Sequence, residues 1–331
     1  MKLDGFQRLA IATTAATYLL IGVGGLVRAA GAGLGCPEWP RCFGGWIPPF
    51  DASGVPPEFD AAQFNVVLAW MEYINRLIGV VVGLLILSTL IFAVRRHRRS
   101  PRVLWPTVAA FLLVVFQGWL GGQVVQSSLH PLVLTAHLGF ALVIVSLLLY
   151  ATVSAFFPSG GPLVPIGGRR LWVARTTLLA IGLVLVQAAL GAWVRGEVQA
   201  LAEAGVPREM WGGELGIVHG IHRNYAILLT AGLLLLVWAV GVLDAEDSWL
   251  RRTCRAVLGL VAVQVGAGVG LSDYGFPRAL QVVHLWCAAL LLGALTVLAL
   301  LLYRLDPRFE RPALSDAKRK PMVWGKQAPS P

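Results

Sequence analysis

Apolar residues run through this chain in segments of about twenty residues or more, separated by shorter polar stretches. Segments of this length cross a bilayer as helices, whereas a membrane barrel would show short strands of alternating polarity. The pattern therefore predicts an all-α, polytopic membrane protein with eight transmembrane helices. The expected spans cover residues 8–28, 64–94, 103–125, 131–157, 170–194, 215–243, 253–272 and 279–304.

The composition agrees with this pattern. Of the 331 residues, 57% are hydrophobic and only 13% are charged, whereas a soluble domain carries roughly 25% charged residues. The first apolar segment could instead be a signal peptide. We favour a span, because no small-residue cleavage site follows it cleanly and "GGLVRAAGAGLG" resembles a helix end that runs into a loop.

The net charge of +10 raises the question of nucleic-acid binding, and the placement of the charges argues against it. Most Lys and Arg residues gather at the N-terminus, in "RRHRRSPR", "GGRRLWVAR" and "RRTCR", and in the C-terminal tail. These segments alternate along the helix count, so the positive-inside rule predicts a multi-pass cell-membrane protein with both termini in the cytoplasm. The basic residues then set topology and contact lipid headgroups. The outward loops are residues 29–63, 126–130, 195–214 and 273–278.

Rare polar residues recur with a constant offset of 147 residues, which indicates an internal repeat. Four spans in each half predict two pseudo-symmetric four-helix bundles related by an axis near the membrane normal. The predicted units are an N-terminal half at residues 1–160, a C-terminal half at 161–304 and a cytoplasmic tail at 305–331. The aligned pairs are Glu72 with His219, Asn75 with His222, Arg76 with Arg223, Gln117 with Gln264, Gly121 with Gly268, and His137 with His284.

Each half places one polar side chain on its second helix and one on its fourth, at similar depth in the outer half of the membrane. These are Asn75 and His137 in the first half, and His222 and His284 in the second. Paired histidines on facing helices of a four-helix bundle are typical of haem binding, because iron takes axial nitrogens on both faces of the ring. Zinc is disfavoured, since neither half offers enough ligands. The alternative is that the histidines are hydrogen-bonded packing residues.

Other polar residues recur near these positions. Arginine pairs well with carboxylates, so we expect arginines to contact the two haem propionates, although residues at helix ends could simply reach the interface. The repeated glutamines would hydrogen-bond a porphyrin substituent or a neighbouring helix. The arginines are Arg28, Arg76, Arg195 and Arg223, and the glutamines are Gln117 and Gln264.

Glu72 makes the two halves unequal, because the second half has His219 at the matching position. A carboxylate near a haem site could pass protons or hold a water molecule, or it could form an ion pair with an arginine. Asn75 is a poor iron ligand, so the first site would hold iron through His137 alone and leave one face open. An open face permits oxygen chemistry, whereas two histidines suit electron transfer. We therefore expect the first half to react and the second half to pass electrons.

Two cysteines, Cys36 and Cys42, lie in the first outward loop. Because the outer side is oxidising, we expect a disulfide there that pins the loop over the first site. A thiol-exchange role is the alternative. The rest of this loop, residues 43–63, is rich in Pro, Gly and aromatic residues and is expected to fold as a cap. Cys254 and Cys287 have no evident partner.

Together these residues resemble the haem A synthase family. The resemblance rests on "GLVRAAGAGLGCPEWPRC", "EYINR", "TAHLG", "HGIHR" and "VVHLW", and it extends over residues 8–304. Members of this family are eight-helix membrane oxidoreductases that convert haem O to haem A by successive hydroxylations of a porphyrin methyl group to a formyl group.

The resemblance implies roles for the polar residues. It implies that His222 and His284 bind a haem b cofactor, that His137 is an axial ligand of the haem O substrate, and that Glu72 is essential nearby. The first-loop cysteines match those of the family. Haem O synthase is then the expected donor of the substrate, and neither the electron donor nor a homo-oligomer is specified.

One position departs from the resemblance. The family motif is Glu-x-x-His-Arg, and this chain has Asn75 in place of the histidine. Three interpretations stay open: a variant site in which His137 alone holds the substrate iron, an engineered change, or an inactive paralogue. A non-enzymatic membrane b-type cytochrome is the competing function.

Overall fold

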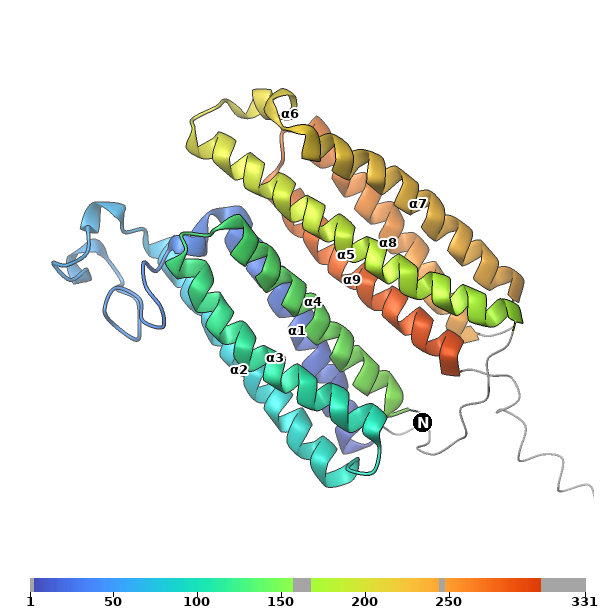
Figure 1. Ribbon diagram of the computed structural model, residues 1–331. Helices are drawn as coiled ribbons and strands as arrows, with labels where there is room; N and C mark the ends of the chain where they lie inside the picture. The colour runs from blue at the N-terminus through green and yellow to red at the C-terminus, as the bar shows by residue number, and fades with distance from the viewer. Residues whose placement is uncertain (1–2, 157–167, 244–247, 305–331) are drawn as a thin grey trace, which may run out of the picture.

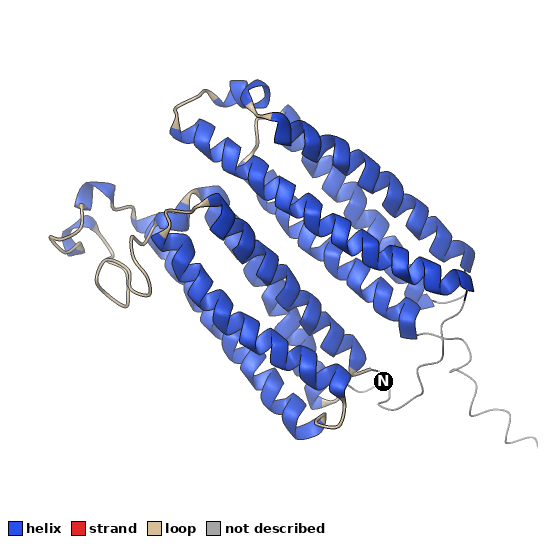
Figure 2. Cartoon of the chain, viewed as in Figure 1, coloured by secondary structure: helices blue, strands red, loops and turns tan. Residues whose placement is uncertain are grey.

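Helices dominate the computed structural model, which describes residues 3–156, 168–243 and 248–304 (Figure 2). In this part of the chain, eight helices are long and apolar enough to cross a membrane, which confirms the predicted fold class. A helix satisfies its own backbone hydrogen bonds, as lipid surroundings require. The predicted cytoplasmic tail lies outside the described residues.

The first four spans begin and end at recognisable signals. Asp4 and Gln7 form a capping box at the start of the first helix, and Gly31 ends it with a positive φ of 80°. The third and fourth helices begin with proline, where the missing N–H removes no helical hydrogen bond. The helices are α1 (Gly5–Ala30), α2 (Val66–Arg96), α3 (Pro101–Gln126) and α4 (Pro131–Ser154).

The second four spans are α5 (Gly168–Glu203), α7 (Ile217–Leu243), α8 (Ser248–Asp273) and α9 (Arg278–Arg304), with the short α6 (Trp211–Glu214) before α7. The prediction that α5 ends at residue 194 is wrong. The sequence "EVQALAE" continues it, because these are mostly good helix formers, and the helix ends just before Gly205, whose φ is positive. The other predicted ends agree closely, the largest difference being the start of α8.

The helices form two bundles that lie side by side (Figure 1). The first bundle contains α1–α4, and the second contains α5 and α7–α9. In the first bundle α1 and α3 each pack against both α2 and α4, and in the second bundle α5 and α8 each pack against both α7 and α9. One diagonal of each bundle is therefore α2 with α4 or α7 with α9, and inward side chains of such a pair face each other across the bundle axis.

The last helix, α9, holds the two bundles together. Its most apolar window is 67% buried, against 17–33% for the other seven spans, and it packs against α1 and α4 as well as α5 and α8. The largest apolar cluster includes Ile21 of α1, Leu142 of α4 and Leu295 of α9. The two bundles therefore share a core.

Candidate functional site

The second bundle brings His222 of α7 and His284 of α9 together across its diagonal. Their ring centroids lie 6.4 Å apart, with the rings inclined by 64°. A metal–imidazole bond is about 2 Å long, so two rings that ligate one ion from opposite sides have centroids about 6 Å apart. The spacing fits a group whose metal lies between these two rings.

A glycine on a neighbouring helix lies against each histidine ring. A Cβ atom on Gly191 of α5 would lie 3.1 Å from Cε1 of His222, and one on Gly268 of α8 would lie 3.3 Å from Cε1 of His284. Larger residues at these glycines would displace the rings. Gly121 of α3 lies in the same way against His137 of α4 in the first bundle, at 3.4 Å.

The ring of His284 is held at both nitrogens by Gln264 of α8. Its Nδ1 lies 3.2 Å from the Gln264 carbonyl oxygen, and its Nε2 lies 3.1 Å from the side-chain amide nitrogen. Nδ1–H donates to the carbonyl, which leaves the lone pair on Nε2. This is the tautomer that binds a metal through Nε2.

Glutamines also hold the other two histidines, through the backbone. Gln117 of α3 donates from Nε2 to the carbonyl oxygen of His137 at 2.7 Å, and Gln187 of α5 donates to that of His222 at 3.0 Å. Of the two roles considered for Gln117, a porphyrin contact and a bond to a neighbouring helix, the structure shows the second, with the backbone of α4. Gln187 was not predicted, because the offset of 147 does not hold for α1 and α5.

Several buried polar atoms around these histidines have no hydrogen-bond partner within the described ranges. Buried polar atoms are normally paired. A cluster of unpaired ones therefore indicates a site where a bound molecule would supply the missing partners. A lone metal ion would lack ligands, since the described residues contain no cluster of three His, Cys, Asp or Glu side chains suited to one. The histidines therefore fit a metal that brings further ligands of its own. The unpaired atoms are Nδ1 of His137 and His222, Oδ1 of Asn75, and Oε1 of Gln117, Gln187 and Gln264.

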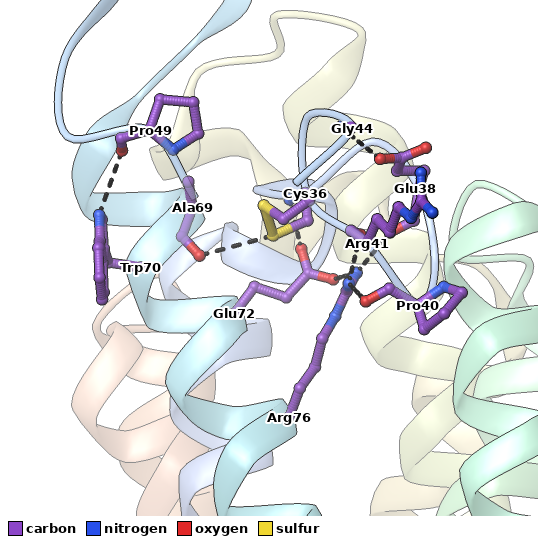
Figure 3. Close-up of a disulfide and its surroundings, with 11 residues drawn as sticks. Cys36, Glu38, Pro40, Arg41, Gly44, Pro49, Ala69, Trp70, Glu72 and Arg76 are labelled. Carbon is purple, nitrogen blue, oxygen red and sulfur yellow. Dashed lines mark hydrogen bonds and ion pairs between the residues drawn. A yellow bond between two sulfur atoms is a disulfide. The ribbon is translucent and has the colours of Figure 1, made fainter. Parts of the chain in front are cut away.

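Glu72 is buried near the N-terminal end of α2, with 4% of its surface exposed. Its Oε1 lies 2.5 Å from Nη2 of Arg76, and its Oε2 accepts a hydrogen bond from the Cys36 backbone N–H at 2.8 Å (Figure 3). The ion pair considered from the sequence is therefore present. Both carboxylate oxygens are bound by groups on α2 and the first outer loop.

Arg76 joins α2 to that loop. It donates to the carbonyl oxygens of Glu38 and Arg41, each at 2.9 Å, and to that of Pro40 at 3.4 Å (Figure 3). Arg76 was expected to bind a haem propionate. In the structure its donors bind Glu72 and the loop backbone, and the propionate contact stays a prediction.

The predicted disulfide between Cys36 and Cys42 is present. The ring it closes sits on the first bundle, where the indole of Trp39 lies so close to α3 that a Cβ on Gly122 would come within 2.9 Å of it. Phe43 follows the disulfide and packs edge-on against two aromatic rings from the rest of the loop.

Further along the same loop, outside the membrane spans, hydrogen bonds from Ser53 lower the pKa of Asp51.

The remaining predicted arginines lie toward the same end of the two bundles as the disulfide loop. Arg195 donates from Nη2 to the carbonyl oxygen of Arg28 at 3.4 Å. An arginine from each bundle therefore lies at the interface between the two bundles. Arg195 is not at a helix end, because α5 continues to Glu203. Arg223 is exposed, and with His219 it lines a shallow cavity of about 410 Å³ at the outer end of α7.

The chain matches the family described as "Cytochrome oxidase assembly protein" (COX15-CtaA) over residues 7–296. It is 29% identical to the "Heme A synthase" of Shewanella oneidensis over 323 residues, covering 85% of this chain and 92% of the relative. It is 28% identical to the one from Shouchella clausii, with 91% and 98% covered, and 29% identical to the one from Symbiobacterium thermophilum, with 91% and 95% covered.

The match runs from the start of α1 into α9, and so includes the histidine pair, Glu72 and the disulfide loop. By this match, the chain belongs to the COX15-CtaA family of cytochrome oxidase assembly proteins.

Proposed function

We propose that this chain is a haem A synthase, which oxidises a methyl group of haem O to a formyl group by successive hydroxylations. The observation that carries the proposal is the His222–His284 pair, whose 6.4 Å spacing and glycine-lined rings suit a haem. Haem b is the cofactor that this pair would hold through iron. With two imidazole ligands, such a haem supplies one-electron transfer.

The first bundle is the proposed site of the substrate. His137 is the candidate ligand of the substrate iron, on the helix that matches α9 in the repeat. Glu72 lies near the outer mouth of the same bundle, where it can hold or pass a proton at Oε1 or Oε2. The disulfide loop lies at this end of the bundle, where its Trp39 contacts α3.

Arginine side chains give the outer ends of both bundles a positive charge that suits the propionates of haem. Arg28 and Arg195 place two of these charges at the bundle interface, between the proposed sites. Arg223 is exposed beside the second site, with His219 on the same cavity. Arg76 acts indirectly, because its donors bind Glu72 and the loop backbone.

The proposed setting is the cell membrane, with both termini in the cytoplasm. The start of α1 and the end of α9 lie at one end of the molecule, and the disulfide loop and α6 lie at the other (Figure 1). Haem O would enter from the lipid, delivered by haem O synthase. The alternative function is a non-enzymatic b-type cytochrome or an inactive paralogue, which the histidine pair and Asn75 would also suit.

The test is the haem content of the full chain, co-expressed with a source of haem O. The haems are extracted, separated by chromatography and identified by mass. We expect haem A or its hydroxylated intermediate beside haem b. Haem b alone, with haem O available, would support the cytochrome or the inactive paralogue.

Replacement of the Glu72 carboxylate separates its role from that of the haem b site. Glu72→Gln keeps the size of the side chain and removes its charge, so we expect the oxidised product to fall at least about tenfold while the haem b absorbance is unchanged. Glu38→Gln is the matched control, because Glu38 is a carboxylate of the disulfide loop that also accepts from a backbone N–H, that of Gly44. A normal haem A yield from Glu72→Gln would contradict the assigned role.

A further inference from the structure

Besides Glu72, the two bundles differ at the inward position of α2 and α7 and at the residue that supports it. Where α7 has His222, α2 has Asn75. Aligning Arg195 with Arg28 in the helices before them pairs Gln187 of α5 with Leu20 of α1. The first bundle therefore lacks both the imidazole and the amide, whose nitrogen lies 3.4 Å from Nε2 of His222.

Asn75 nevertheless occupies the same place in its bundle as His222. Its Oδ1 lies 4.0 Å from a Cβ built on Gly24 of α1, just as His222 lies against Gly191 of α5. This oxygen is buried and has no hydrogen-bond partner in the described part of the chain. Leu20 packs against the apolar cluster of the first bundle. The first bundle therefore has an apolar side chain at the position where the second bundle has the amide of Gln187.

A carboxamide at this position can donate or accept a hydrogen bond, and it is a weak ligand for iron compared with an imidazole. Asn75 is also shorter than a histidine, which leaves room between it and a metal held from the opposite helix by His137. We propose that the α2 side of the first haem site binds a small exogenous ligand of the iron, hydrogen-bonded by Asn75. The ligand class is water, a small anion or a diatomic molecule of similar size.

This inference rests on the substrate-haem site of the proposed function. It adds that the position opposite His137 is open to solutes, and that Asn75 recognises what binds there. Azide is a suitable probe, because it is a small anion that binds ferric haem with a free axial position and accepts hydrogen bonds.

The experiment uses the full chain purified with haem b and co-expressed haem O, kept ferric and without a reductant. We expect one high-spin haem and one low-spin haem by electron paramagnetic resonance, with azide converting only the first. His137→Ala assigns this signal, since it removes the proposed ligand. Asn75→Leu should keep the high-spin signal and weaken azide binding about three- to tenfold, the loss expected for one hydrogen bond.

The converse variant rebuilds the second bundle's pair in the first. Leu20→Gln with Asn75→His should give a second low-spin haem that no longer binds azide, and Leu20→Gln alone should leave azide binding intact. A first-site haem that is already low-spin and indifferent to azide in the unchanged protein would overturn the inference. Equal azide affinity in Asn75→Leu would also overturn it. Uptake of haem b alone would overturn the substrate site itself, and the inference with it.

Discussion

At the scale of single residues, Glu72 and Arg76 show how a membrane helix carries charged groups. An isolated buried charge is costly, and a paired and hydrogen-bonded one is far less so. Glu72 has Arg76 on one oxygen and the Cys36 N–H on the other. Arg76 has, in addition, three loop carbonyls. The pair therefore fastens the disulfide loop to α2.

Removal of Arg76 should cost more when the Glu72 carboxylate is present than when it is absent. Arg76→Met leaves the Glu72 carboxylate buried without its cation, so we expect the free energy of unfolding to fall by about 3–5 kcal/mol. In a Glu72→Gln background the same change should cost at least about 1 kcal/mol less, because no charge is left unpaired. The measurement is a double-mutant cycle by denaturant unfolding in detergent.

The cycle is informative because the loop carbonyls lose Arg76 in both backgrounds. Their contribution cancels, and the difference reports the ion pair. If Arg76→Met costs the same in the unchanged protein and in the Glu72→Gln background, Arg76 acts only through the loop backbone.

Sequence reasoning goes furthest at this scale where a residue type carries its own chemistry. The two cysteines of the first loop predicted their disulfide, which is present. The histidines stood out because imidazoles are rare in apolar helices, and their role as haem ligands stays a prediction. The partners of Arg76 could not be predicted, because backbone carbonyls have no sequence signature and become available only when the loop folds. Gln187 could have been found by aligning α1 and α5 separately, through Arg28 and Arg195.

At the scale of elements, α1 belongs to the first bundle and also forms much of the contact with the second. Trp286 of α9 donates from Nε1 to the Tyr18 carbonyl oxygen at 2.9 Å, and its ring lies over Gly22. Leu285 reaches Gly25. Small residues let membrane helices approach closely, and the gain is in packing rather than in escape from water. The glycines of α1 thus bring α9 against the first bundle.

A methyl group at this contact should separate the helices. A Cβ on Gly293 of α9 would overlap the Tyr18 hydroxyl and lie 3.0 Å from Leu149, so we expect Gly293→Ala to lower the free energy of unfolding by about 1–3 kcal/mol. Gly83→Ala in α2 is the matched control, because its Cβ meets no atom within 4 Å. It should be neutral or stabilise the helix by up to about 1 kcal/mol. Thermal unfolding in detergent measures both.

The hydroxyl provides a specific check. Tyr18→Phe removes the atom that Gly293→Ala would meet first, so the double variant should recover part of the loss. No recovery would place the cost of Gly293→Ala in the helix itself and not in the contact with α1. The spans of both helices were predicted from their apolar runs, whereas this contact depends on which glycines face each other, and hydropathy does not report that.

At the scale of the whole molecule, one scaffold occurs twice with different residues at the inward positions. The scaffold is a diagonal pair of helices whose inward side chains lie against glycines of the neighbouring helices. The second bundle completes it with His222 and Gln187, and the first carries Asn75 and Leu20 in their places. The repeat was visible in the sequence because polar residues kept their spacing in three of the four helix pairs. The extension of α5 to Glu203 was not visible, since this polar segment has no apolar run.

If the bundles differ mainly by these residues, the second should be convertible into the type of the first. Gln187→Leu with His222→Asn leaves His284 and Gly268 in place, so we expect haem b to be retained through one imidazole. Its ferric spectrum should change from low-spin to high-spin, and it should gain azide binding that the unchanged haem b lacks. Gln187→Leu alone is the control and should stay low-spin, because both histidines remain. Retention of a low-spin haem b in the double variant would mean that His222 is not its ligand, and the 6.4 Å spacing of the two rings would then need another explanation.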